Sequence, residues 1–198
     1  VTPAVAPSNL LLLEPTIRER ACQILDDLPI GEEFDWVDKV SIELTTMTLA
    51  TLFDFPWEER RKLTRWSDVT TAAPETGIVA SYEARREELI ECAMYFKGLW
   101  DQRVNEPPRN DLISMMAHAP ATKDMPFLEF LGNLLLLIVG GNDTTRNSIS
   151  GGVLALNQNP DEYRKLNDDP SLITSMVPSG WSISPKAPAV PNGRSSVT

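Results

Sequence analysis

The chain has 198 residues, of which 42% are hydrophobic, and its 18 basic and 28 acidic side chains give a formal net charge of −10. This composition supports a folded core and excludes a disordered chain, and the acidic balance argues against nucleic-acid binding through a basic surface. The longest apolar run, at 134–139, is far shorter than the ~20 residues of a membrane-spanning helix, so no span is predicted.

The first residues contain no Met and no signal-peptide pattern, from which we expect a fragment or a processed form. Cys22 and Cys92 are far apart and lack CxxC spacing, so neither a disulfide framework nor a structural zinc site is predicted. This cysteine usage favours a reducing compartment, the cytoplasm. His118 is the only histidine, which excludes a metal site built on a pair of histidines.

Helix patterns dominate the first half of the chain. Apolar residues spaced by three and four predict helices over 15–28 and 36–53, and Asp35 is placed to cap the second. Pro56 suits the first turn of the following helix. A long helix is predicted over 78–104.

The second half is also predicted to be helical. Asp111 is expected to cap a short helix that ends at Ala117, and a loop follows over 120–126. No proline interrupts 127–158, so one helix of about 48 Å is predicted there, long enough to run through a domain rather than over it. A further helix begins at Pro160. The predicted fold class is therefore mainly α.

The composition changes near Pro178. Residues 178–198 contain four prolines, five serines and no acidic residue, and they show no helical period. We therefore predict one domain over 1–177 and a disordered tail over 178–198.

The most informative segment lies in the middle of the predicted long helix. Gly140 and Gly141 each cost about 1 kcal/mol relative to Ala in a helix, and a polar run follows them at once over 142–147. Apolar residues precede them. A buried helix that becomes weak and polar at its midpoint breaks local rules, and such breaks tend to mark function.

The residue types in this segment suggest a specific chemistry. Glycine lets a flat ligand approach the backbone at Gly140 and Gly141. Thr144 lies four residues after Gly140, on nearly the same face, and its hydroxyl can either bond back to the Gly140 carbonyl or hold a water. Asp143 can take or release a proton beside it.

Alternatives remain open on these residues alone. Gly140 and Gly141 could close one helix while Asp143 caps the next. Arg146, three residues after Asp143, could pair with the carboxylate or gate its protonation, and we favour pairing.

The segment Gly140–Thr145 resembles the [AG]-G-x-[DE]-T-T motif of the long central helix in the cytochrome P450 family of haem-thiolate monooxygenases. Segments 55–63, 111–116 and 159–166 are also similar to family regions, and the resemblance covers roughly 9–177. It is strongest to bacterial soluble alkane hydroxylases that oxidise terminal methyl groups. The expected architecture is the helical part of the cytochrome P450 fold.

The resemblance implies roles for individual residues. Haem, held elsewhere by a cysteine thiolate, would activate O₂ beside Gly140, Gly141 and Thr144. Thr144 would position water at the bound oxygen, and Asp143 would relay protons from solvent. Leu136 and Val139, together with Gly140, would line an apolar substrate pocket for medium-chain alkanes. Electrons would come from NAD(P)H through a ferredoxin reductase and a ferredoxin.

The sequence also departs from the family pattern. The cysteine loop F-x-x-G-x-x-x-C-x-G is absent, neither Cys22 nor Cys92 fits it, and the E-x-x-R helix expected after Val177 is missing. We therefore expect an internal fragment that does not bind haem through thiolate and does not turn over alone. The alternative from a different class is a non-catalytic all-α binding module.

Overall fold

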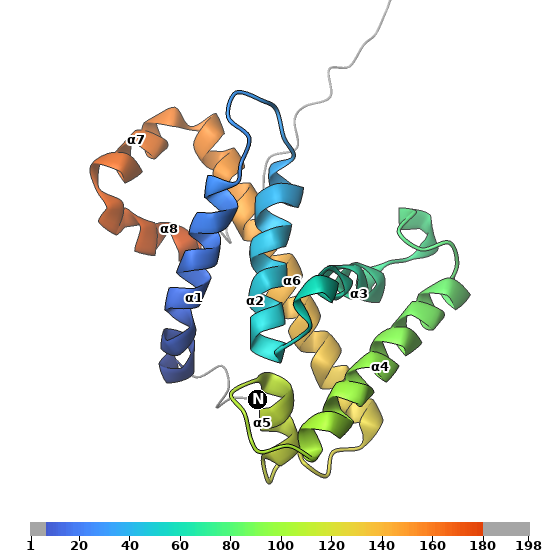
Figure 1. Cartoon of the computed structure of the whole chain (residues 1–198). Coiled ribbons are helices and arrows are strands. Elements are labelled where there is room, and N and C mark those ends of the chain that lie inside the picture. The colour runs from blue at the N-terminus through green and yellow to red at the C-terminus, as the bar shows by residue number, and fades with distance from the viewer. Residues whose placement is uncertain (1–6, 180–198) are drawn as a thin grey trace, which may run out of the picture. The chain divides into compact units, whose positions relative to one another are not determined.

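A computed structural model describes residues 7–179, and every regular element in that range is a helix. In chain order these are α1 (Pro7–Asp26), the π-helical segment η1 (Val37–Ile42), α2 (Glu43–Phe53), η2 (Trp57–Glu59), α3 (Arg61–Thr71), η3 (Pro74–Thr76), α4 (Tyr82–Val104), α5 (Leu112–His118), α6 (Phe127–Gln158), α7 (Pro160–Asp168), η4 (Pro170–Leu172) and α8 (Ile173–Ser179) (Figure 1). The prediction of a mainly α fold is confirmed. None of the helices described over 7–179 has the length and apolarity needed to cross a membrane.

Local capping signals define several helix ends as predicted. The Asp111 carboxylate accepts a hydrogen bond from the Ser114 amide at 2.8 Å and begins α5. Asp35 accepts from the Asp38 amide at 3.1 Å at the start of η1. Each cap satisfies an amide that the first helical turn leaves without a partner.

Two predicted boundaries are wrong. α1 begins at Pro7 rather than at residue 15, and Pro15, which the sequence pattern placed at the start, lies inside the helix. α4 begins at Tyr82 rather than at 78, because the Ser81 hydroxyl accepts from the Ala84 amide at 3.1 Å and fixes the start there.

Contacts divide the chain into two compact units, Val1–Asn147 and Ser148–Thr198, and the division falls inside α6. Residues 178 and 179 belong to the last described helix, α8, and the predicted domain boundary at 178 stays a prediction. In the second unit α8 lies close to the last turns of α6, since a Cβ on Gly152 would stand 3.3 Å from the Met176 methyl. The rest of the predicted tail, 180–198, lies outside the described residues.

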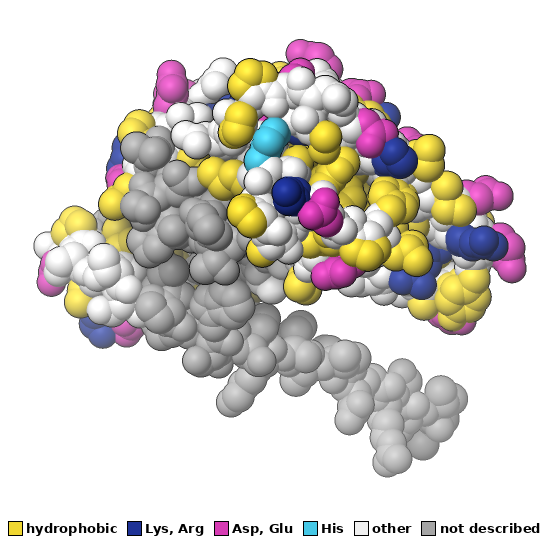
Figure 2. Space-filling model, turned by 90° about the horizontal axis from the view of Figure 1, so that it is seen from below, with side chains coloured by type: hydrophobic (Ala, Val, Ile, Leu, Met, Phe, Trp, Pro, Cys, Tyr) yellow, Lys and Arg dark blue, Asp and Glu magenta, His cyan; other side chains and the backbone are white. Residues whose placement is uncertain are grey.

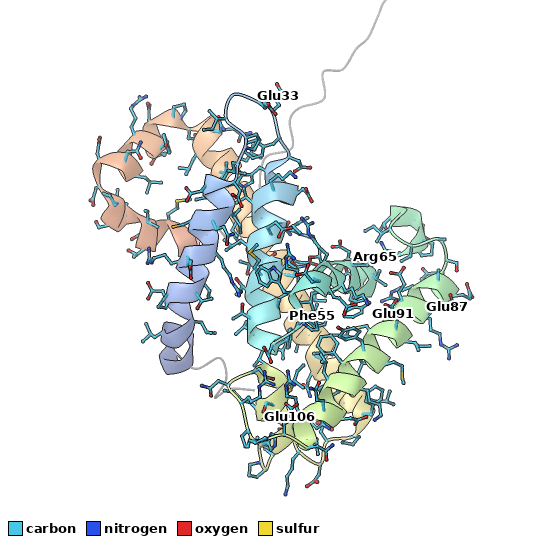
Figure 3. All side chains as sticks on the ribbon, viewed as in Figure 1. Glu33, Phe55, Arg65, Glu87, Glu91 and Glu106 are labelled. Carbon is cyan, nitrogen blue, oxygen red and sulfur yellow. The ribbon has the colours of Figure 1, made fainter. Side chains whose placement is uncertain are left out.

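An aromatic cluster forms the core of the first unit. The ring of Phe55 lies 5.0 Å from that of Tyr95, 5.7 Å from Phe96 and 6.1 Å from Trp66, between centroids (Figure 3). These rings come from α3, α4 and the segment after α2. Burial of such large apolar surfaces holds α3, α4 and this segment together and gives α6 a fixed base to pack on.

Candidate active site on α6

Helix α6 is continuous from Phe127 to Gln158 and passes through Gly140 and Gly141 without a break. The prediction of one long helix is therefore confirmed, and the alternative in which the two glycines end a helix is wrong. Packing compensates for the low helix propensity of glycine, because α6 buries a row of side chains spaced by four residues. The buried row consists of Phe130, Leu134, Ile138 and Asn142.

A second row on α6 faces outward. It has the same four-residue spacing and consists of Leu128, Gly132, Leu136, Gly140 and Thr144, all of them exposed. Leu128 and Leu136 are 79% and 72% exposed, which is unusual for leucines on a helix with a buried opposite face. In the view from below in Figure 2, hydrophobic side chains are likewise visible at the surface. We call the row from Leu128 to Thr144 the open row.

The open row contains most of the residues that were predicted to bind substrate and cofactor. Leu136, Gly140 and Thr144 follow one another along it, as the sequence spacing predicted. Val139, which precedes Gly140, is half-buried at its edge. The predicted apolar pocket is therefore an open surface in this chain rather than an enclosed cavity, because no described helix covers Leu136.

The two adjacent glycines have different surroundings. At Gly140 nothing lies within 4 Å of the position that a Cβ would take. At Gly141 a Cβ would stand 2.8 Å from the Leu49 Cδ2 atom of α2, closer than atoms can pack. Gly140 is therefore open to a flat ligand, whereas the missing side chain of Gly141 admits Leu49 of α2, and the predicted role of both glycines toward a ligand stays a prediction.

Thr144 and Gly140 are brought together by a hydrogen bond. The Thr144 hydroxyl donates to the Gly140 carbonyl oxygen at 2.8 Å, which is one of the two arrangements predicted from the sequence. The hydroxyl therefore lies over the bare backbone at Gly140. A group that competes for that carbonyl would free the hydroxyl to bind water or a ligand.

Asp143 is held toward α3. Its Oδ1 atom accepts from the buried Ser67 hydroxyl at 3.2 Å and from the Arg146 guanidinium at 3.0 Å. The same nitrogen of Arg146 donates to Asp68 at 3.1 Å. The favoured pairing of Arg146 with Asp143 is confirmed, and the partly buried network also ties α6 to α3.

Sequence reasoning missed Asn142, which is 0% exposed. It accepts a hydrogen bond from the Thr45 hydroxyl of α2 at 2.9 Å. The available signal was the spacing of four after Phe130, Leu134 and Ile138, which places Asn142 next in the buried row. No comparable spacing pattern pointed to the contacts made by Ser67, Asp68 and Leu49.

The described residues offer no alternative metal centre. Over 7–179 no group of three or more His, Cys, Asp or Glu side chains is placed to hold a metal ion. Cys22 is exposed on α1, and Cys92 is buried in α4. Burial, with a smaller effect of Glu91, raises the pKa of the Cys92 thiol to about 12, which disfavours the thiolate that binds iron.

The buried thiol makes stability depend on pH. The folded Cys92 has a higher pKa than the ordinary 9.0, so its contribution to stability is complete below pH 9 and is lost as the pH rises toward 12. We expect the free energy of unfolding to fall as the pH rises from about 9 toward 12, and to fall less in Cys92→Ala. Urea unfolding of both chains measures this, and parallel pH profiles would contradict it.

In chemical terms the site combines an apolar surface with a hydroxyl and a carboxylate. Gly140 exposes backbone, Thr144 offers a hydroxyl, and Leu136 supplies apolar contact beside them. Asp143, one residue away and held by Ser67 and Arg146, is a carboxylate within the same helical turn. This combination suits a reaction that needs protons next to an apolar substrate.

No family model matches the chain. Linalool 8-monooxygenase from Pseudomonas putida is 32% identical over 174 residues, covering 87% of this chain and 43% of that protein. Among solved structures, cytochrome P450-153 from Novosphingobium aromaticivorans is 47% identical with a TM-score of 0.77, covering 90% of this chain and 43% of that one. CYP153D17 from Sphingomonas sp. PAMC 26605 is 48% identical with a TM-score of 0.80, covering 91% and 45%. The chain thus spans somewhat less than half the length of these relatives.

Proposed function

Because the chain belongs to the cytochrome P450 family, we propose that it supplies the central helix and its supporting helices to a haem-thiolate monooxygenase. The observation that carries the proposal is the unbroken α6, on which an open Gly140 lies beneath the hydroxyl of Thr144. The reaction is insertion of one oxygen atom of O₂ into an unactivated C–H bond.

The residues present fit one face of a haem. The space beside Gly140 is what a flat macrocycle needs to approach the helix, and Thr144 adds a hydroxyl there. At Gly141 the absence of a side chain also serves packing, because a Cβ there would meet Leu49. When bound, the haem supplies O₂ activation and C–H oxidation. Neither Cys22 nor Cys92 fits as the thiolate ligand, so these residues would contact the haem without ligating its iron.

Thr144 and Asp143 would divide the proton chemistry. The Thr144 hydroxyl would leave the Gly140 carbonyl and hold a water at the open face. Asp143 would take a proton from solvent and pass it toward that water after releasing its contacts to Ser67 and Arg146. The network with α3 therefore controls when the carboxylate is available.

The proposed substrate is a medium-chain alkane that is hydroxylated at its terminal carbon. The 47–48% identity to two CYP153 structures supports this subclass, and the exposed Leu136 with the adjoining Val139 supplies apolar surface without a hydrogen-bonding group. An alkane has no polar atom, so its recognition must rest on shape and apolar contact. Electrons would reach the cytoplasmic enzyme from NAD(P)H through a ferredoxin reductase and a ferredoxin.

A chimera tests the proposal with a complete set of ligands. The matching segment of CYP153D17 is replaced by residues 9–177 of this chain, so that the relative contributes the rest of the enzyme. We expect the reduced, CO-treated chimera to show the red-shifted Soret band of a thiolate-ligated haem, and to convert an alkane such as octane to the primary alcohol. A folded chimera without that band would refute the proposed cofactor site, and a band without hydroxylation would refute the proposed substrate class.

A further inference from the structure

A buried polar contact joins the middle of α6 to α2. Asn142 and Thr45 are 97 positions apart and are 0% and 2% exposed, and the Thr45 hydroxyl lies 2.9 Å from Asn142 Oδ1. Within the described part of the chain, the Asn142 Nδ2 atom has no hydrogen-bond partner although it is buried. The Thr45 hydroxyl also lies 3.0 Å from the Ser41 carbonyl oxygen, so it stands between its own helix and the amide of Asn142.

The neighbouring residue makes a contact of a different kind with the same helix. Leu49, one turn after Thr45 on α2, fills the notch at Gly141, where a Cβ would stand 2.8 Å from Leu49 Cδ2. One contact is a directional hydrogen bond and the other is a close steric fit. Adjacent residues of α6 thus meet two positions one turn apart on α2.

These two contacts restrict α6 in a way that the apolar row cannot. Phe130, Leu134 and Ile138 are fully or almost fully buried, but apolar contacts are non-directional and tolerate rotation or sliding of one helix on another. A rotation of α6 about its axis would separate Asn142 from Thr45. A shift along α2 would drive a residue with a side chain against Leu49.

We propose that Asn142 and Thr45, with Gly141 and Leu49, form a register lock that fixes the rotation of α6 on α2. A single buried polar pair that sets helix register at a cost in stability is a known device in helical assemblies. Asn142 lies two residues from both Gly140 and Thr144, so the lock keeps these two on the open row. Asn142 and Thr45 are thus positioning residues, which act by holding Gly140 and Thr144 in place.

The importance of the lock for catalysis rests on the proposed function, but the lock itself needs no cofactor. Its test therefore uses the full chain without haem. The paired substitution Thr45→Val with Asn142→Leu replaces both polar groups by apolar groups of similar shape, which buried sites tolerate when both partners change together. We expect the midpoint of thermal unfolding to be retained or raised, because the partnerless Nδ2 is removed.

The diagnostic readout is the amide NMR spectrum of α6. In the paired variant we expect the signals of Gly140, Gly141 and Thr144 to split or broaden, and the Gly141 amide to exchange with solvent about tenfold faster. The conservative variant Thr45→Ser keeps the hydroxyl and is expected to retain single signals. The matched control is Thr46→Val with Thr64→Val, which removes a buried 2.6 Å hydroxyl pair between α2 and α3 and leaves α6 untouched.

Each outcome decides the question. Single, sharp α6 signals in the paired variant would overturn the lock, because register would then be fixed by apolar packing alone. Loss of folding in that variant would also overturn it, since the polar pair would be a stabilising element. Equal splitting in the control would show general loosening and reject a specific lock. A chimera without the haem band, combined with split signals here, would remove the proposed function and leave the lock standing.

Discussion

Gly141→Leu is expected to lower the free energy of unfolding of this chain by about 3 kcal/mol, whereas Gly140→Leu is expected to raise it by about 0.5 kcal/mol. The difference comes from the surroundings of these adjacent residues, whose side-chain directions differ by about 100° around the helix axis. A side chain at 141 must displace Leu49, which is 3% exposed and has little room to move. A side chain at 140 meets open space and gains the better helix propensity of leucine.

Urea unfolding of the full chain, followed by tryptophan fluorescence, measures both effects. Gly98→Leu on α4 is the matched control, because nothing lies within 4 Å of its Cβ position either. It should behave like Gly140→Leu. Equal losses at 140 and 141 would show that the two glycines share one environment and would contradict the assignment of Gly141 to helix packing.

The largest functional effect is expected at Thr144. In the chimera, Thr144→Ala should lower the fraction of consumed O₂ that appears as alcohol by about tenfold and raise release of hydrogen peroxide. The reason is that alanine has no hydroxyl to hold a water above Gly140, so that no water would direct protons to one position there. Parallel assays of O₂ consumption, peroxide and product give the ratio.

Two further variants distinguish the effect of losing the Thr144 hydroxyl from the effect of disturbing the helix. Thr144→Ser retains a hydroxyl and should keep most of the coupling. Thr145→Ala changes the adjacent exposed threonine and should leave coupling unchanged. If Thr144→Ala produced as much alcohol per O₂ as the unaltered chimera, the role assigned to this hydroxyl would be wrong.

Local signals were sufficient to predict much of the helical framework. The absence of proline between Pro126 and Pro160 predicted α6 with its observed ends, and Asp111 predicted the start of α5. Both depend on interactions within a few residues, which a sequence displays directly. The four-residue spacing of Gly140 and Thr144 likewise predicted that they share a face, because helix geometry is regular.

The contacts between residues far apart in the chain could not be predicted from the sequence. The separate roles of Gly140 and Gly141 depend on Leu49, which is about ninety residues away in sequence and packs on only one of them. The direction of Asp143 depends on Ser67 of α3, 76 positions earlier. Asn142 looked like one member of a polar run, and only its packing on α2 shows that it belongs to the buried row.

Haem is expected to lie against the open row at Gly140, and the CO spectrum of a Gly140→Leu chimera tests this placement. Leucine there fills the space that the ligand needs, so the thiolate-type CO band should fall at least about tenfold relative to the unaltered chimera, while Gly98→Leu retains it. Stability measurements on the same samples confirm that the protein remains folded. A full CO band in the folded Gly140→Leu chimera would contradict the claim.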